Sequence, residues 1–248
     1  KNHLLGLIIR RNHRERENIV LSAEKTASSL GYSLVVSYVE TEEEIPGHVG
    51  EMAKRQVSGL IIDSEKKAEC GRLEGAVVYL SQTKEFDERQ KITFYYRLSE
   101  AGRLAAERLM GEGHQKIACV TYKRDARIQD GYRLAVQSRN LPLQPVWSYE
   151  GETIEEIEKY GIRQCLSENV TAVICGSADI ACCIWKLMER TRTVVPDGLS
   201  MITIGDTDML QLLGDGVTAV RLPAECMSRD AVEYLVDMIE GQKQIELM

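Results

Sequence analysis

Three of the chain's seven cysteines lie within the short stretch VICGSADIACC, residues 173–183. Such a cluster raises the question of a thiol or zinc site, because thiolates are good zinc ligands. Structural zinc sites usually take two closely spaced ligand pairs, whereas here Cys175 is followed by the adjacent Cys182 and Cys183. Neighbouring residues on a helix point about 100° apart. We therefore expect buried structural thiols, against the weaker alternative of a redox or metal site.

The sequence contains no established catalytic pattern. G-x-S-x-G, H-E-x-x-H, G-x-G-x-x-G and P-loop motifs are missing, and the four histidines, at positions 3, 13, 48 and 114, form no recognisable Cys/His motif. The segment GEGHQK (111–116) follows a predicted helix rather than a strand, so it predicts a helix end and not a phosphate loop. We expect no enzymatic activity, no catalytic residues, no metal site and no cofactor.

The most charged stretch is RRNHRERE (10–17), directly after the apolar run HLLGLIIR (3–10). That run predicts a buried strand, and ligands of open parallel sheets bind beyond the carboxyl ends of the strands. The stretch is either a solvated loop, which is the commoner case, or the lip of an anion site. Its candidate ligand-binding residues are Arg10, Asn12, His13 and Arg16.

Length and composition bound the class of protein. The 248 residues, 44% of them hydrophobic, suffice for one large or two smaller α/β domains. No apolar run approaches the roughly 18 residues of a membrane span. The seven cysteines are odd in number and scattered, which predicts a cytoplasmic location. The net charge of −7 argues against DNA binding by the chain itself, and its start at Lys1 leads us to expect a preceding segment.

Short apolar runs alternate with helical segments along the chain, which is the pattern of βαβ units and parallel sheets. Two such blocks stand in tandem. Predicted strands cover 3–10, 32–39, 59–63, 76–81, 92–96, 116–122, 146–150, 171–176 and 199–205. Predicted helices cover 17–31, 47–58, 99–113, 124–140, 153–168 and 178–192. A last strand and helix, 217–223 and 224–241, either extend the second sheet or cross back to the first.

Four motifs resemble the effector-binding domain of the LacI/GalR family of transcriptional repressors. They are SEAGRLAAERLMGEGHQKIACVT (99–121), DGYRLAV (130–136), TAVICGSADIA (171–181) and VPDGLSMITIGDTD (195–208). The family has, at the same places, helix–Gly–His–strand, Arg-x-x-Gly-aromatic, ANDxxAxG and VPxDISVVGFDD. Each motif alone is weak, but the four match in order and spacing over nearly the whole chain.

The resemblance implies a periplasmic-binding-protein-like fold of type I, with two doubly wound parallel-sheet subdomains, a cleft between them and three hinge crossings. It implies an N-terminal subdomain of 1–115 plus 207–241 and a C-terminal subdomain of 116–206 plus 242–248. The crossings would lie near 114–116, 205–208 and 241–244, with helix 224–241 in the first subdomain. It also implies a homodimer whose DNA-binding head, of helix-turn-helix or winged-helix type, is absent from this chain.

Two motifs lose the residues with which the family holds sugars. The Arg of the Arg-x-x-Gly motif is replaced by Ile128, although Arg127 stands next to it. The Asn-Asp pair is replaced by Ser177 and Ala178, which leaves Asp179 one place late. Hydroxyl recognition depends on paired donors and acceptors, so the resemblance disfavours a neutral hexose.

Other positions have also lost the residues that the family has there. Of the two Asp residues of the FDD motif only Asp206 remains, and the Asp that often precedes helix 99–113 becomes Arg97, with Glu100 the nearest carboxylate. The paired aromatics of the first loop align with Glu15 and Arg16. One interpretation is an anionic effector, such as a phosphorylated sugar or a carboxylate, and the other is a different or degenerate effector site. The arginines that could face an anion are Arg10, Arg14, Arg16, Arg97 and Arg127.

These observations predict the ligand-sensing and dimerisation domain of a LacI/GalR-like repressor, in which effector binding changes operator affinity. The candidate ligand-binding set is Arg10, Asn12, His13, Arg16, Arg97, Glu100, Arg127, Ser177, Asp179 and Asp206. One rival is a solute-binding protein of a sugar uptake transporter, which would share the fold but would normally be exported. The other rival is a doubly wound enzyme, for which no nucleophile, base or phosphate loop is found.

Overall fold

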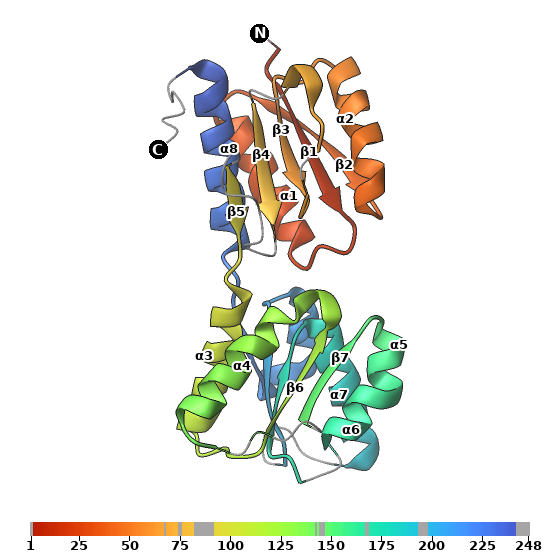
Figure 1. Ribbon diagram of the computed structural model, residues 1–248, viewed down its shortest axis with the longest axis vertical. Coiled ribbons are helices and arrows are strands. Elements are labelled where there is room, and N and C mark those ends of the chain that lie inside the picture. Colours follow the sequence, from red (N-terminus) through yellow and green to blue (C-terminus); the bar gives the residue numbers. More distant parts are fainter. Residues whose placement is uncertain are drawn as a thin grey trace. The chain divides into compact units, whose positions relative to one another are not determined.

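The computed structural model describes residues 2–66, 68–73, 76–81, 92–141, 143, 147–166, 169–192 and 198–241. The chain divides into two compact units, one made of Lys1–Tyr96 and Pro223–Met248 and the other of Arg97–Leu222. Each unit is built on a five-stranded parallel sheet with helices packed against it (Figure 1). The predicted α/β class with two parallel sheets is confirmed.

The first unit has the strand order β2–β1–β3–β4–β5. Its strands are β1 (Leu4–Arg10), β2 (Ser33–Val39), β3 (Gly59–Asp63), β4 (Val77–Ser81) and β5 (Thr93–Tyr95). Its helices are α1 (Arg16–Ser29), α2 (Ile45–Lys54) and α8 (Ala224–Glu240), with short 3-10 turns η1 (Glu42–Glu44) and η2 (Gly71–Leu73). Because β1 pairs directly with β3, the residues that follow these two strands are neighbours at the carboxyl edge of the sheet.

The second unit has the strand order β10–β9–β8–β6–β7. Its strands are β6 (Ile117–Tyr122), β7 (Ser148–Gly151), β8 (Ala172–Cys175), β9 (Ser200–Ile204) and β10 (Val217–Val220). Its helices are α3 (Leu98–Gly111), α4 (Arg127–Ser138), α5 (Ile154–Glu156), α6 (Ile162–Leu166) and α7 (Ala178–Thr191). It also has the 3-10 segments η3 (Lys123–Asp125) and η6 (Asp208–Gly216) and the π-helical segment η5 (Ile157–Gly161). Here β6 lies between β7 and β8, so its carboxyl end is central.

Burial explains why the strands are continuous apolar runs. Every residue of β3, β4 and β6 is buried, since helices cover both faces of a parallel sheet. The core of the second unit includes Trp147, which is 2% exposed. Among the described helices, none is both long and apolar enough to cross a membrane.

Helix α3 belongs to the second unit, whereas the predicted boundary at residue 115 put it in the first subdomain. The reason is its close packing along α4. A Cβ atom on Gly102 would lie 2.0 Å from the carbonyl oxygen of Ile128, and one on Gly131 would lie 1.7 Å from that of Ser99. The two helices therefore meet backbone to backbone, which only glycine permits. The chain passes from one unit to the other between Tyr96 and Arg97.

The last strand and the last helix go to different units, so the predicted segment 207–241 is divided. Strand β10 pairs with β9 and extends the second sheet. Helix α8 joins the first unit, where the Ser228 hydroxyl donates to the Ile19 carbonyl at 2.7 Å and the Ser22 hydroxyl to the Glu225 carbonyl at 2.9 Å. The second passage between the units follows Leu222 rather than residues 205–208. The predicted segment 242–248 lies outside the described residues.

Candidate functional site

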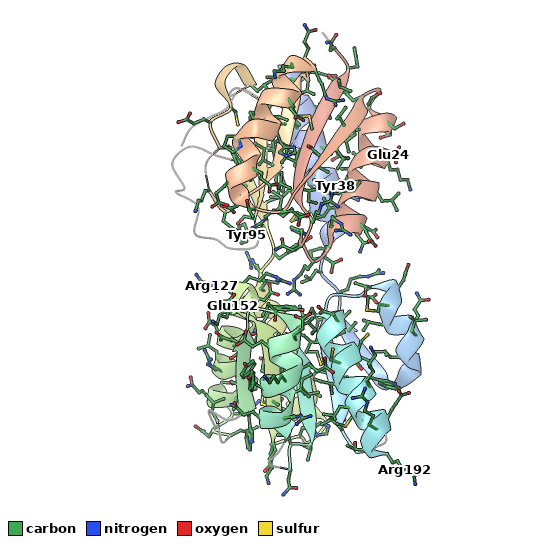
Figure 2. The ribbon with its side chains drawn as sticks, turned by 90° about the vertical axis from the view of Figure 1, so that its right-hand side faces the viewer. Glu24, Tyr38, Tyr95, Arg127, Glu152 and Arg192 are labelled. Atoms are coloured by element: carbon green, nitrogen blue, oxygen red, sulfur yellow. The ribbon has the colours of Figure 1, made fainter. Side chains whose placement is uncertain are left out.

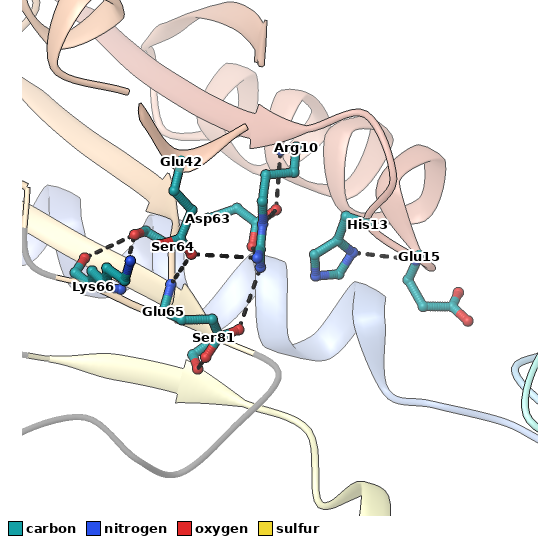
Figure 3. Close-up of polar contacts among 9 residues, drawn as sticks. All are labelled: Arg10, His13, Glu15, Glu42, Asp63, Ser64, Glu65, Lys66 and Ser81. Carbon is teal, nitrogen blue, oxygen red and sulfur yellow. Dashed lines mark hydrogen bonds and ion pairs between the residues drawn. The ribbon is translucent and has the colours of Figure 1, made fainter. Parts of the chain in front are cut away.

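At the carboxyl edge of the first sheet, Arg10 is held by three carboxylates (Figure 3). Its Nη2 atom lies 2.6 Å from Asp63 Oδ1, and its Nε and backbone N–H groups donate to Asp63 Oδ2 at 3.1 and 3.0 Å. Glu65 and Glu42 lie 3.3 and 3.4 Å from the same guanidinium. The Asp63 side chain is fully buried and that of Arg10 is 15% exposed. We call these four residues the Arg10 clasp.

The carboxylates of the clasp stabilise the charge of Arg10. Burial alone would lower the pKa of Arg10, but the hydrogen bond and charge of Asp63, aided by Glu65 and Glu42, outweigh burial and raise that pKa. A guanidinium already shared by three carboxylates has little capacity left for an external anion. The guanidinium of Arg10 is thus already paired within this unit, and a contact between Arg10 and an anionic ligand stays a prediction.

The clasp also holds two loops against the strand ends. The Glu42 carboxylate accepts from the backbone N–H of Glu65 at 2.8 Å, which joins the turn after β2 to the turn after β3. The hydroxyl of Ser81, at the end of β4, donates to Glu65 at 2.5 Å. Four neighbouring strand ends are thus connected through one polar network.

The loop after β1 turns His13 inward rather than toward solvent. His13 is 4% exposed, its ring lies 5.9 Å from that of Tyr96, and its Nδ1 accepts from the backbone N–H of Glu15 at 3.3 Å. Glu15 is buried as well. Burial raises the pKa of Tyr96, and the nearby Glu15 adds to the rise. This arrangement places Tyr96, which the sequence did not single out, beside the predicted His13.

The remaining predicted residues of that loop differ in exposure. Asn12 is exposed. Arg16 is half-buried, donates to the Arg11 carbonyl at 2.6 Å and lies 3.2 Å from Glu17. Arg16 therefore helps to shape the loop, and the structure does not bring it to the Arg10 clasp.

At the carboxyl edge of the second sheet, Ser177 and Asp179 are brought together as expected for residues that follow one strand. Both side chains form hydrogen bonds within this unit. The Asp179 carboxylate accepts hydrogen bonds from the hydroxyls of Ser177 and Tyr122, and from the backbone N–H of Ile180 at 2.9 Å. Tyr122 ends the neighbouring strand β6 and is 5% exposed. Burial and then the bond to Asp179 raise the pKa of Tyr122.

The turn after β6 carries a group of cations at the same edge. The Arg124 guanidinium lies 4.0 Å above the centre of the Tyr122 ring, while Lys123 pairs with Glu152 at 3.0 Å. Arg127 lies 4.0 Å from Asp130 at the start of α4. Arg127 and Glu152 lie at one end of this unit, and Arg192, which follows α7, lies at the other (Figure 2).

Three further predicted residues, Arg97, Glu100 and Asp206, lie on the surface of this unit, near the start of α3 or after β9. Arg97 is exposed directly before α3, and Glu100 accepts from Arg103 Nε at 2.9 Å, a bond that lowers the pKa of Glu100. Asp206, after β9, pairs with Arg221 at 3.3 Å. The structure does not gather these residues around Asp179.

The cysteine cluster is part of the strand-to-helix passage from β8 to α7. Cys175 is buried in β8, and burial raises its thiol pKa. Cys182 and Cys183 are half-buried on α7, where burial first and Asp179 or Glu158 second raise their pKa values. Within the described part of the chain, no group of three or more His, Cys, Asp or Glu side chains could hold a metal ion. Raised pKa values mean little thiolate at neutral pH.

These surroundings predict an order of thiol reactivity. Iodoacetamide at neutral pH should label Cys226 first, because it is exposed on α8. Cys182 and Cys183 should follow slowly, and Cys175 only after unfolding, since their thiols are shielded and weakly acidic. Peptide mass spectrometry over a time course measures the order, and rapid labelling of Cys182 or Cys183 would contradict it.

Asp63, Tyr122 and Arg124 are the important residues that the sequence did not single out. Each stands at a strand end or in the turn after it, in GLIID (59–63) or in TYKRD (121–125). Both segments were recognised as strand ends. Knowing which strands are neighbours in a doubly wound sheet would have placed Asp63 beside Arg10.

Two parallel α/β units are the architecture of the doubly wound class, in which ligands bind beyond the carboxyl ends of the strands. Residues 106–246, more than half of the chain, match the family model of the periplasmic binding protein-like domain. The chain belongs to this family.

The curated relatives are transcriptional repressors. The repressor PurR of Actinobacillus pleuropneumoniae is 24% identical over 91% of this chain and 70% of its own length, and the ribose operon repressor of Escherichia coli K12 is 22% identical over 96% and 76%. PurR of Aliivibrio salmonicida is 28% identical over 58% of this chain, a match that spans 45% of that relative. The predicted resemblance to LacI/GalR effector-binding domains is confirmed.

Solved structures show the same fold. A transcriptional regulator CelR in complex with cellobiose superposes with a TM-score of 0.84 at 20% identity, over 98% of this chain and 80% of that one. A regulatory protein of the LacI family from Chloroflexus aggregans gives 0.83 at 18% identity, over 99% and 93%. At these identities the likeness establishes the architecture alone.

Proposed function

We propose that this chain is the ligand-sensing and dimerisation domain of a cytoplasmic LacI/GalR-type transcriptional repressor that has no enzymatic activity. The observation that supports it most is the match of 91–96% of the chain to repressors. The same matches favour a repressor over the alternative, a solute-binding protein of an uptake transporter. Operator DNA would be bound by a domain outside this chain, which fits its net charge of −7.

The mechanism is a shift between two arrangements of a homodimer. A small-molecule effector that prefers one arrangement stabilises it, and operator affinity changes by the same coupling free energy. The effector contacts come from the carboxyl edges of the sheets, where the polar side chains gather. Because Arg10 is already paired in its clasp, an anionic effector would be held more readily by other cations, in the second unit above all.

The test is effector-dependent DNA binding by the full-length protein. Fluorescence anisotropy with DNA from upstream of its own reading frame should show specific binding whose dissociation constant changes when sugar phosphates, organic acids or neutral sugars are added. The 248-residue chain alone, as the control, should not bind the same DNA. Failure of the full-length protein to bind DNA, or binding that no stabilising small molecule alters, would refute the proposal.

A further inference from the structure

We propose that Arg124, stacked on the Tyr122 ring that Asp179 anchors, is a specificity-determining residue that binds a carboxylate or phosphate group of the effector. This inference rests on the proposed function, since it names the class of effector that the second unit recognises. Two successive contacts, from Asp179 through Tyr122 to Arg124, and the charge around Arg124 carry it.

The first contact fixes the aromatic ring. Tyr122 is 5% exposed and packs in the core of the unit, and its hydroxyl donates to Asp179. Asp179 is itself held by the Ser177 hydroxyl and by its neighbour's backbone N–H. A ring fixed both by packing and by a hydrogen bond presents its face in one orientation.

The second contact fixes the guanidinium. Arg124 lies 4.0 Å from the centre of the Tyr122 ring, within the range of a cation–π contact. Stacking uses the flat face of a guanidinium and leaves the N–H groups at its edge available. An arginine on the surface is normally mobile, so the stacking reduces the entropy that anion binding would otherwise cost.

The third point is the charge around Arg124. Its neighbour Lys123 is paired with Glu152 at 3.0 Å, and Arg127 lies 4.0 Å from Asp130. Arg124 is exposed, and the described residues place no carboxylate within ion-pair distance of it. A planar, oriented and unpaired guanidinium at the carboxyl edge of a parallel sheet suits bidentate binding of a carboxylate or phosphate.

The same geometry disfavours a neutral sugar. A sugar hydroxyl can both donate and accept, and carboxylate oxygens are common acceptors for its O–H group. Both oxygens of Asp179 already accept hydrogen bonds from the protein. Asp179 therefore has about one acceptor position left for a sugar hydroxyl, whereas an anion would use the N–H groups of Arg124.

Isothermal titration with ribose 5-phosphate, inorganic phosphate and gluconate tests the inference on the 248-residue chain. The wild type should bind at least one of them. Comparing its affinities for the two phosphates with its affinity for gluconate shows whether the site prefers a phosphate or a carboxylate. Arg124→Gln should weaken binding at least about tenfold, the loss of a charge-assisted bond. Arg124→Lys should also lose affinity, because lysine keeps the charge without the stacked, bidentate group. Tyr122→Leu should reduce affinity less than Arg124→Gln.

The matched control is Arg139→Gln, at the other end of α4, which should bind as the wild type does. If Arg124 had only a structural role, Arg124→Gln would lower the melting temperature without changing the dissociation constant. Unchanged affinity in Arg124→Gln, or a wild type that binds none of the three anions, would overturn the inference. Neither result would refute the repressor function, which the DNA-binding experiment tests separately.

Discussion

Replacing Gly131 by alanine is expected to lower the free energy of unfolding by about 3 kcal/mol or more. The new methyl group would lie 1.7 Å from the Ser99 carbonyl oxygen and 2.8 Å from the Arg103 backbone nitrogen. Both atoms belong to the backbone of α3, so no side-chain movement can relieve the overlap. The two helices would have to separate, and apolar surface between α3 and α4 would be exposed. Urea denaturation followed by circular dichroism measures the loss.

Gly50→Ala is the matched control for this prediction. Gly50 lies in α2 and is exposed, and a Cβ atom there would meet nothing within 4 Å. Alanine has the higher helix propensity, so this variant should be as stable as the wild type or more stable by about 0.5–1 kcal/mol. If Gly131→Ala proved as stable as Gly50→Ala, the backbone contact between α3 and α4 would be incorrect.

The order of elements could be predicted because each strand is a short apolar run and each helix has its own period. Those are local signals, and burial on both faces of the sheets makes them strong. The unit to which an element belongs is not a local property. Helix α3 joins the second unit because glycines at positions 102 and 131 let two backbones meet, and a glycine in a helical segment does not by itself indicate its partner.

The side-chain pairs of the candidate site could not be predicted from the sequence for a similar reason. Arg10 was correctly placed at a strand end, but its partner Asp63 stands 53 residues further along the chain. Tyr122 and Asp179 are separated by 57 residues. In both cases the strand was recognised and the pairing was not, because pairing depends on strand order. The family resemblance named candidate ligand-binding positions, and it could not indicate that these side chains form hydrogen bonds with one another.

Asp63→Asn is also expected to have a large effect, and should destabilise the first unit by about 2–3 kcal/mol. Asp63 is fully buried and accepts from Arg10 Nε, Nη2 and the backbone N–H. Asparagine keeps the shape but loses the negative charge and one acceptor, so the largely buried guanidinium of Arg10 is left under-compensated. Glu42 and Glu65 remain, which is why the loss should be smaller than for an isolated buried pair. Chemical denaturation of the wild type and of Asp63→Asn measures this loss of stability.

Asp206→Asn is the comparison that isolates burial. Asp206 also follows a strand and pairs with an arginine, but its side chain is 43% exposed and that of Arg221 is 78% exposed. Solvent screens such a pair, so the variant should change stability by no more than about 0.5 kcal/mol. In a double-mutant cycle, Arg10→Met combined with Asp63→Asn should cost less than the sum of the single variants, because no unpaired guanidinium remains. Equal losses for Asp63→Asn and Asp206→Asn, or strict additivity in the cycle, would mean that the clasp does not hold the strand ends together.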